Sequence, residues 1–443
     1  MVMMGLELTD KLPFHTVYLH AMVRDKEGRK MSKSLGNVID PLEVIHGCTL
    51  DHLLKKLESG NLPAKEVEKS KKDQRADFPS GIPVCGSDAL RFGLLAYTVQ
   101  GRDVNLDIKR VVGYRSFCNK LWNATKFALT YLKDFQPTAT LLEDTMSSGK
   151  MAIRDKFIIS RLMYACASVN SNLKEYKFGD AQQSIYSFWI DDLCNVYLET
   201  IKPVFKEDKG VGGAKQLAQA CLWLALEQGL RLLHPMIPFV SEELWQRLPG
   251  RGTLGEDETN SIMIASYPQC IDEYRNLDAE RSMATALTVV KACRALRASY
   301  QIHFKTLTKF YVKAGETEID IRAQSDDIKT LGLGEILEIN IEESNLPKSV
   351  GIDVIDDQTT VLMDIKGLVD FEVEIKKLEK NLGKTSQPLK NLQHQMAKPD
   401  YDVKISDELK KKNAEKLEGL LKKVNDINKA IENFRNLAEA EKN

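Results

Sequence analysis

The sequence has few of the features that hold small or secreted domains together. Its eight cysteines are scattered over 443 residues, and no two of them form a Cys-x-x-Cys pair. This spacing excludes a zinc ribbon and argues against a disulfide framework. We therefore predict reduced thiols in a cytoplasmic protein, with no structural zinc and no metal-ligating residues.

Membrane and targeting signals are also missing. No apolar run is long enough to span a bilayer, and the N-terminus shows neither a basic segment with a cleavage site nor an Arg-rich amphipathic stretch. The formal net charge is only −1. Without an overall positive charge, any nucleic-acid partner must be held by local basic patches. We expect no membrane partner.

The chain has no Gly-rich phosphate loop and no GxGxxG motif, yet one lysine-rich stretch suits phosphate chemistry. It reads Lys30-Met31-Ser32-Lys33-Ser34 and follows an apolar, β-branched run at 16–23 that predicts a buried strand. Turn chemistry at 25–28 places the lysines on a loop beyond that strand. Two ammonium groups on a mobile loop can close on a triphosphate and follow its charge as pyrophosphate leaves. The alternative is a solvated lysine loop without a function.

With its flanks, this lysine loop resembles the second signature motif of the class I aminoacyl-tRNA synthetases. The stretches 78–83 and 86–91 resemble the junction into the anticodon-binding helices of the valine, isoleucine and leucine enzymes. The stretches 101–107, 119–127 and 367–370 resemble the valyl members in particular, with the isoleucyl members as the alternative. The first signature of the class, a His-x-Gly-His type motif, and its editing domain are absent. The chain therefore resembles the C-terminal part of a longer enzyme.

The resemblance implies an activity and the residues that serve it. Enzymes of this class condense ATP and an amino acid to an aminoacyl adenylate, and then pass the acyl group to the tRNA 3′ end. Lys33 would contact the α/β-phosphates and Lys30 would support it, both as catalytic residues. The ATP phosphates, with their Mg²⁺, would be bound by Lys30, Ser32, Lys33 and Ser34. The two serines are equally suited to holding the loop.

Periodicity predicts a mainly α-helical protein, which the resemblance divides into five segments. These are the end of a Rossmann-like α/β catalytic domain (1–50), a junction or insertion (51–107), an anticodon-binding helical bundle (108–303), a small α+β connector (304–365) and an antiparallel coiled-coil tRNA-binding arm (366–443). We expect bundle helices at 157–173, 181–201, 214–233 and 280–298, and connector strands at 307–312 and 359–363. Pro388 should kink or interrupt the first helix of the arm.

One segment of the bundle has the composition of a nucleic-acid-binding helix. Residues 108–133 include six Lys or Arg, five aromatic residues and no Asp or Glu. A basic face that carries aromatic rings suits phosphate contacts and stacking on unpaired bases. The predicted tRNA-binding residues are Arg91, Arg115, Lys120, Trp122, Asn123, Lys126 and Phe127. The alternative is an ordinary bundle helix, in which the Trp122 ring would be equally suited to the core; Trp189, Trp223 and Trp245 are expected there.

The resemblance thus implies the C-terminal part of a ligase that activates valine with ATP and charges tRNA(Val). This chain would supply the lysine loop and the tRNA-binding surfaces, and alone it should be inactive because the first signature motif is missing. Two interpretations from other classes stay open: a non-catalytic tRNA-binding protein derived from a synthetase, and a coiled-coil scaffold with a vestigial lysine loop. The choice of amino acid cannot be argued from these residues.

Overall fold

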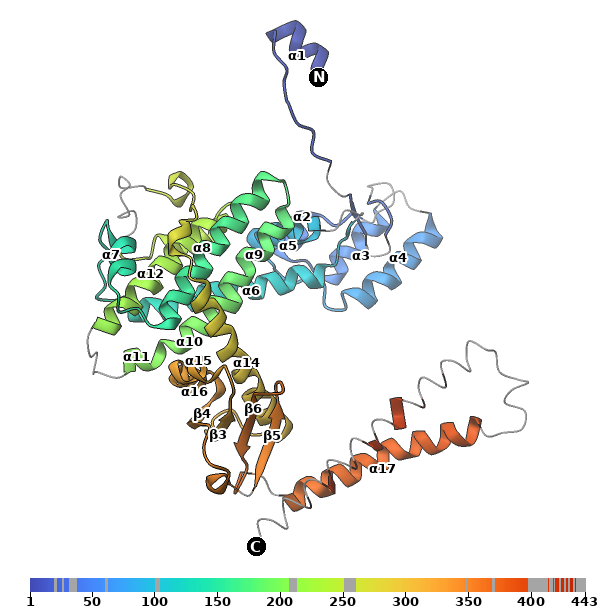
Figure 1. Ribbon diagram of the computed structural model, residues 1–443. Helices are drawn as coiled ribbons and strands as arrows, with labels where there is room; N and C mark the ends of the chain where they lie inside the picture. The colour runs from blue at the N-terminus through green and yellow to red at the C-terminus, as the bar shows by residue number, and fades with distance from the viewer. Residues whose placement is uncertain are drawn as a thin grey trace. The chain divides into compact units, whose positions relative to one another are not determined.

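The computed structural model describes the chain except for residues 20–21, 26–27, 32–37, 60–62, 100–103, 207–212, 251–259, 348, 369–370 and 397–412. Beyond 412 it describes residues 413, 417, 419–421, 424–425, 428, 431–432 and 435. The chain divides into two compact units, Met1–Arg281 (unit 1) and Ser282–Asn443 (unit 2). Both consist mainly of helices, and unit 2 also contains a small sheet (Figure 1). The mainly α prediction is therefore confirmed.

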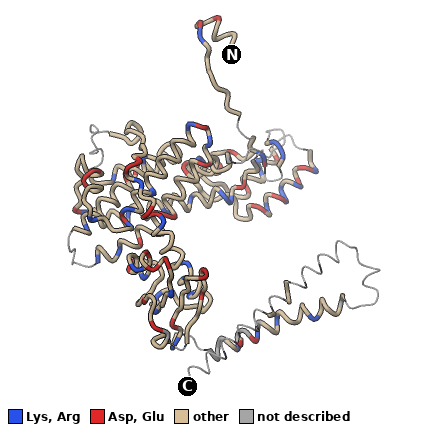
Figure 2. The backbone as a smooth tube through the Cα atoms, in the orientation of Figure 1, with Lys and Arg blue, Asp and Glu red and all other residues tan. Residues whose placement is uncertain are grey.

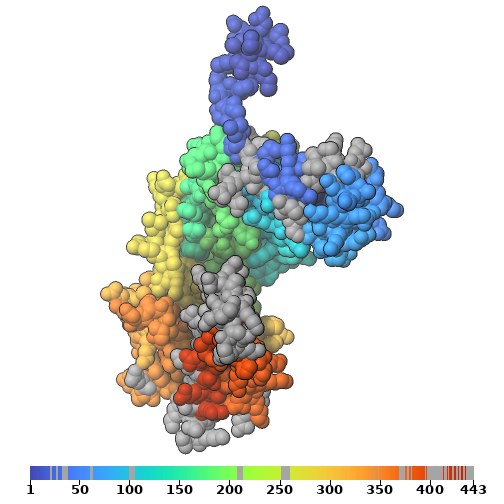
Figure 3. Space-filling model, turned by 90° about the vertical axis from the view of Figure 1, so that its right-hand side faces the viewer, coloured from blue at the N-terminus to red at the C-terminus, as the bar shows by residue number. Residues whose placement is uncertain are grey.

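The first part of unit 1 consists of short helices and one pair of very short strands. Its elements are α1 (Val2–Thr9), β1 (Val23–Arg24), α2 (Pro41–His46), α3 (Leu50–Glu58), α4 (Ala64–Asp77), α5 (Ser87–Ala96), the 3₁₀ turn η2 (Tyr97–Val99) and β2 (Val104–Asn105). α3 and α4 pack against each other and form the lighter blue lobe in Figure 3.

The prediction of a buried strand at 16–23 is wrong. Only Val23, its last residue, belongs to a strand, β1, which pairs in parallel with β2 through Val23↔Val104 and Arg24↔Asn105. Val17 and Leu19 are 68% and 89% exposed. In the described part of unit 1, β1 and β2 form a two-stranded sheet with no further strand. An apolar run becomes a buried strand only where neighbouring strands satisfy its backbone hydrogen bonds.

The rest of unit 1 is a helical bundle. Its elements are α6 (Ile108–Tyr131), α7 (Leu141–Ser147), α8 (Ile153–Lys174), α9 (Phe178–Ser187), the π-helix η3 (Phe188–Tyr197), α10 (Leu198–Thr200), α11 (Lys202–Lys206), α12 (Ala214–Leu233), α13 (Pro238–Trp245), and the 3₁₀ turns η5 (Ile262–Ile264) and η6 (Asp272–Tyr274). The predicted helices at 157–173 and 214–233 correspond to α8 and α12. The one predicted at 181–201 begins in α9 and continues through η3, because apolar spacing does not distinguish a π-helix from an α-helix.

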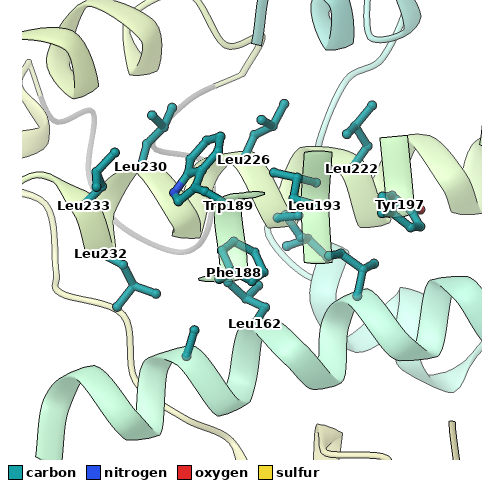
Figure 4. Close-up of a cluster of buried hydrophobic side chains, with 14 of the residues drawn as sticks. Leu162, Phe188, Trp189, Leu193, Tyr197, Leu222, Leu226, Leu230, Leu232 and Leu233 are labelled. Carbon is teal, nitrogen blue, oxygen red and sulfur yellow. The ribbon is translucent and has the colours of Figure 1, made fainter. Parts of the chain in front are cut away.

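Large aromatic side chains form the centre of this bundle. Trp189, Trp223 and Trp245 are each 0% exposed, which confirms them as core residues. Figure 4 shows Trp189 and Phe188 between α8 and the leucines of α12. Each indole N–H has a partner: Trp189 donates to the Gly229 carbonyl at 3.2 Å and Trp223 to the Pro249 carbonyl at 2.7 Å. The core therefore contains satisfied polar groups as well as apolar packing.

A buried ion pair lies in the same core. Glu227 is 0% exposed and Arg231 is 5% exposed, and Arg231 Nε donates to Glu227 Oε1 at 2.5 Å. Trp245 Nε1 donates to the same carboxylate oxygen at 3.0 Å, and Arg231 Nη1 donates to the Ser266 carbonyl at 3.1 Å. Each charge thus depends on the other for its compensation.

Unit 2 is built around a four-stranded sheet. Its elements are α14 (Leu277–Ser299, from Ser282 onward), β3 (Thr308–Lys313), α15 (Glu318–Ala323), α16 (Ser325–Gly332), β4 (Gly334–Ile339), the 3₁₀ turn η7 (Glu343–Asn345), β5 (Val350–Val354), β6 (Thr360–Asp364) and α17 (Phe371–Met396). The strand order is β4-β3-β6-β5, with β3 and β4 parallel and the other pairs antiparallel. The strands predicted at 307–312 and 359–363 are confirmed as β3 and β6.

The two units divide within α14, although the sequence predicts a bundle that extends to 303. In unit 2, Arg297 of α14 donates to the Thr306 carbonyl at 2.7 Å and to the His303 carbonyl at 2.9 Å. These bonds fix the turn that leads from α14 into β3. Most of α14, from Ser282 onward, is therefore part of the small α+β unit.

α17 continues through Pro388, so the expected interruption is wrong. A proline removes only its own backbone donor, and the other hydrogen bonds of this 26-residue helix maintain it. The second helix of the expected coiled-coil arm lies largely outside the described residues. Of its described residues, Arg435 donates to Glu379 of α17 at 2.8 Å, and Ile431 is buried.

Candidate nucleotide loop and nucleic-acid interface

A tight hairpin precedes the lysine loop and fixes where the loop begins. Arg24 and Lys30 form an antiparallel bridge, and the Asp25 N–H donates to the Arg29 carbonyl at 2.9 Å. Asp25 is 6% exposed, and its carboxylate accepts from the backbone N–H of Arg29 at 2.7 Å and from its Nε at 2.8 Å. Gly28, at φ 80°, closes the turn. Lys30 is thus exposed at the end of a hydrogen-bonded hairpin.

The other residues predicted to bind ATP phosphates cannot be placed in the same way. Ser32, Lys33 and Ser34 lie outside the described residues. Of the predicted nucleotide-binding set, the structure therefore locates Lys30 alone.

The hairpin is joined by hydrogen bonds to the segment that begins α6. The Leu106 N–H donates to the Arg24 carbonyl at 2.9 Å, next to the β1–β2 pairing. One residue later, the Asp107 side chain caps α6 by accepting from the Lys109 N–H at 2.9 Å. Tyr97 Oη accepts from the Asp107 N–H at 3.0 Å. The start of the lysine loop and the start of the basic helix therefore belong to one bonded unit.

α6 has the two faces that its sequence predicts. Phe117, Leu121 and Ala128 are at most 4% exposed and pack into the core. Six of the predicted tRNA-binding residues are exposed on the helix: Arg115, Lys120, Trp122, Asn123, Lys126 and Phe127. Trp122 is 39% exposed, so the structure places its ring at the surface and not in the core.

Partners from distant parts of the chain complete this surface. The Arg247 guanidinium lies 5.5 Å from the centre of the Trp122 ring, and Lys202 Nζ lies 5.3 Å from the centre of the Phe127 ring. Lys120 Nζ donates to Asn195 Oδ1 at 2.9 Å. Sequence reasoning missed Arg247, Lys202 and Asn195, because only folding brings them beside α6. Arg247 also pairs with Glu243 one turn earlier.

Arg91, the seventh predicted tRNA-binding residue, belongs to α5 and not to α6, and its side chain contacts the protein itself. Its Nη2 donates to the Pro235 carbonyl at 2.9 Å and its Nε to the Met236 carbonyl at 3.4 Å. From the same helix, the Asp88 carboxylate accepts from the Val240 N–H at 2.7 Å, in the first turn of α13. Burial raises the pKa of Asp88, although this hydrogen bond opposes the shift. Arg91 therefore bonds α5 to the turn between α12 and α13, and Asp88 bonds it to the first turn of α13.

Basic and acidic residues are mixed along the chain, and the cysteines are free thiols. Lys and Arg alternate with Asp and Glu along the helices in Figure 2. The eight cysteines form no disulfide, and burial raises the pKa of Cys118 and of Cys166 to about 12.

Within the described residues, no three His, Cys, Asp or Glu side chains gather as metal ligands would. None of the described helices has the length and apolarity that crossing a bilayer requires.

Comparison with known proteins identifies two families within the chain. Residues 1–107 match the class I tRNA synthetases of the I, L, M and V group, and residues 155–312 match the anticodon-binding domain of tRNA ligases. α6 lies between the two matched ranges. A LeuRS–tRNA–LeuAMS complex from Agrobacterium radiobacter aligns with a TM-score of 0.39 and 20% identity over 62% of this chain and 27% of that one.

Relatives match nearly the whole chain. A valine–tRNA ligase of Rattus norvegicus is 42% identical over 99% of this chain, and a mitochondrial valine–tRNA ligase of Arabidopsis thaliana is 41% identical over 95%. One of Schizosaccharomyces pombe is 44% identical over 75% of the chain. The chain covers 34%, 38% and 33% of these three relatives, so it spans about a third of their length.

Proposed function

We propose that this chain, which belongs to the class I tRNA synthetases as a homologue of valine–tRNA ligases, serves the ATP-dependent activation of valine and its transfer to tRNA(Val). The observation that carries this proposal is the homology to valine–tRNA ligases over 95–99% of the chain. The relatives named above are valine–tRNA ligases, which favours the valine enzyme over the isoleucine alternative. The reaction would take place in the cytoplasm.

The lysine loop would serve the adenylation step. The attacking carboxylate of valine is already ionised, so this step needs alignment and charge stabilisation more than a general base. Lys33 would contact the α/β-phosphates, supported by Lys30, and Ser32 and Ser34 would bind phosphate oxygens or hold the loop. The exposed ammonium group of Lys30 suits a triphosphate, which would bring its own Mg²⁺.

The helical surfaces would hold the tRNA. The exposed basic and aromatic face of α6 would contact the anticodon region, with Arg115, Asn123 and Lys126 near phosphates and Trp122 beside unpaired bases. α17 and the segment that pairs with it through Glu379 and Arg435 would form a coiled-coil arm on the tRNA.

The isolated 443-residue chain is expected to form no adenylate. Lys30 and Lys33 act on ATP that other residues position, and this chain contains no His-x-Gly-His motif to do so. Valine-dependent exchange of labelled pyrophosphate into ATP measures the step directly, with a full-length valine–tRNA ligase as the positive control. Exchange above background by the purified chain would show that it holds a complete site.

The same chain is expected to bind tRNA(Val), and two substitutions on α6 should weaken that binding in different ways. Trp122→Ala should remove a base stack of about 1–3 kcal/mol and reduce the preference for the cognate anticodon. Lys126→Ala should weaken all tRNAs alike and lower the dependence of the Kd on salt, since one phosphate contact is lost. Filter binding with cognate and anticodon-swapped tRNA, at several salt concentrations, gives both quantities.

The melting temperature separates these effects from folding. Because Trp122 is 39% exposed, its truncation should change the Tm little. A large fall in Tm with unchanged anticodon preference would assign Trp122 to packing. If the chain binds tRNA tightly while the full-length protein still lacks valine activation, the non-catalytic interpretation replaces the ligase.

A further inference from the structure

A hollow opens between α6 and α9, apart from the face that carries Trp122. It has a volume of about 280 Å³ and is lined by Arg110, Gly113, Tyr114, Gln183 and Tyr186. Gly113 and Trp122 are nine positions apart. Nine residues make about two and a half turns of an α-helix, so the two residues lie on opposite sides of α6. None of the tRNA-binding residues predicted from the sequence lines this hollow.

The walls of the hollow are two tyrosine rings whose positions are fixed by the core. The Tyr114 ring packs edge-on against Phe92, with 5.4 Å between centres, and the Tyr186 ring lies 5.0 Å from the Phe117 ring. Neither ring needs to be ordered when a ligand binds, so little entropy is lost. Rigid aromatic walls favour a flat, unsaturated ligand.

The polar groups at the rim suit a neutral ligand with a hydrogen-bonding edge. Gln183 is exposed, and its Nε2 donates to Ser187 Oγ at 3.2 Å. The amide also carries a second N–H and a carbonyl oxygen, which can donate to and accept from a ligand. Among the described residues that line the hollow, Arg110 is the one cation, and its guanidinium lies over the Tyr97 ring at 4.7 Å. Burial, and then the neighbouring Asp191 carboxylate, raise the pKa of Tyr186. A hollow with one lining cation, and with a carboxylate near its Tyr186 wall, is a poor phosphate site but suits an uncharged base.

The hollow lies on the same side of α6 as two residues already proposed to bind RNA. Gly113, Lys120 and Phe127 are spaced by seven residues, so they lie in line along one side of α6. Lys120 bonds to Asn195, and Lys202 lies over the Phe127 ring, both along the same side. A single-stranded segment of RNA that follows this side of α6 would contact cations and aromatic rings alternately. Proteins that bind unpaired nucleic acid contact it in this way.

We propose that the hollow between α6 and α9 takes one unpaired nucleobase of the bound tRNA, held between the rings of Tyr114 and Tyr186 with its edge toward Gln183. The volume lies just below the roughly 300–1,000 Å³ that holds a drug-sized ligand, which leaves room for one base. The inference rests on the proposed tRNA binding and adds to it a second contact, on the side of α6 opposite Trp122.

Gly113 allows a test that leaves the fold intact. It is an exposed helical residue, and a Cβ placed on it would meet nothing within 4 Å. Gly113→Leu should fill the hollow and, since leucine favours a helix over glycine, maintain or raise the Tm. The Kd for a tRNA(Val) transcript should rise roughly fivefold to a hundredfold, the range of one base–aromatic stack, with an unchanged salt dependence. Ala64→Leu is the matched control, because it places the same side chain on an exposed residue of α4 that does not line the hollow, and its Kd should stay within about twofold of the wild type.

Ultraviolet cross-linking locates the base independently. In the wild-type chain with bound tRNA, mass spectrometry should find a base joined to Tyr114 or Tyr186, and Gly113→Leu should abolish that cross-link. A Kd for Gly113→Leu equal to that of the wild type, or cross-links confined to other residues, would overturn the inference while the proposed function stands. A wild-type chain that binds no tRNA overturns both.

A free nucleotide carries the same kind of base as the tRNA, so its binding is tested in a separate experiment. AMP, CMP, GMP and UMP are each titrated into the chain without RNA and followed by calorimetry. Saturable binding that Gly113→Leu abolishes would assign the hollow to a free nucleotide and overturn the tRNA base as its occupant. Failure of all four to saturate supports the proposal, because a tRNA base gains its affinity from the rest of the bound RNA.

Discussion

Lys33→Ala in the full-length protein is expected to slow valine activation by about 10²–10³-fold while the affinity for valine changes little. One unit charge about 4 Å from a phosphate oxygen, at an effective dielectric near 20, contributes roughly 4 kcal/mol. Solvent screening of a loop residue reduces this contribution, and the remainder corresponds to the expected fold-change in rate. Pyrophosphate exchange at saturating ATP and valine measures the rate.

The control for this experiment is Lys65→Ala. Lys65 is an exposed lysine on α4, outside the proposed loop, and its loss should leave the exchange rate unchanged. Lys30→Ala should fall between the two, because Lys30 is assigned a supporting role. A change of less than about threefold in the Lys33 variant would remove that residue from the catalytic set.

Arg231→Met is expected to destabilise the fold of unit 1 by about 3–5 kcal/mol. The substitution leaves the fully buried Glu227 carboxylate without its cation, and an uncompensated buried charge costs several kcal/mol. In a domain of roughly 150–250 residues, each kcal/mol lowers the Tm by about 2–4 °C, so we expect a fall of about 10 °C. Chemical denaturation and thermal melting of the isolated chain both report it.

The double variant Glu227→Gln/Arg231→Met provides the comparison. It removes both charges, and the glutamine oxygen can still accept from Trp245 Nε1. It should therefore be considerably more stable than Arg231→Met alone, as double-mutant analysis of a coupled pair requires. If Arg231→Met unfolds with a free energy within about 1 kcal/mol of the wild type, the pair contributes little to the fold.

The sequence-based predictions succeeded where the signal lies within one element. The faces of α6 follow from residues three and four positions apart, so its buried residues Phe117, Leu121 and Ala128 could be assigned from the sequence. The same reasoning identified α8, α12, β3 and β6. It failed at 16–23, where the apolar run resembles a strand but the described residues provide no neighbouring strand. At Pro388, where a kink or an interruption was expected, the interruption does not occur, because a long helix continues despite the loss of one backbone donor.

The sequence by itself determined the helical class of the protein, the exposed basic face of α6 and the relationship to valine–tRNA ligases, because each depends on residue types in a fixed order. Only the tertiary structure decided which residues from distant parts of the chain lie beside α6. Arg247 reaches Trp122 across 125 positions, and Gln183 and Tyr186 meet Gly113 and Tyr114 across about 70. No periodicity links residues so far apart, since helix packing, and not chain order, sets their distance.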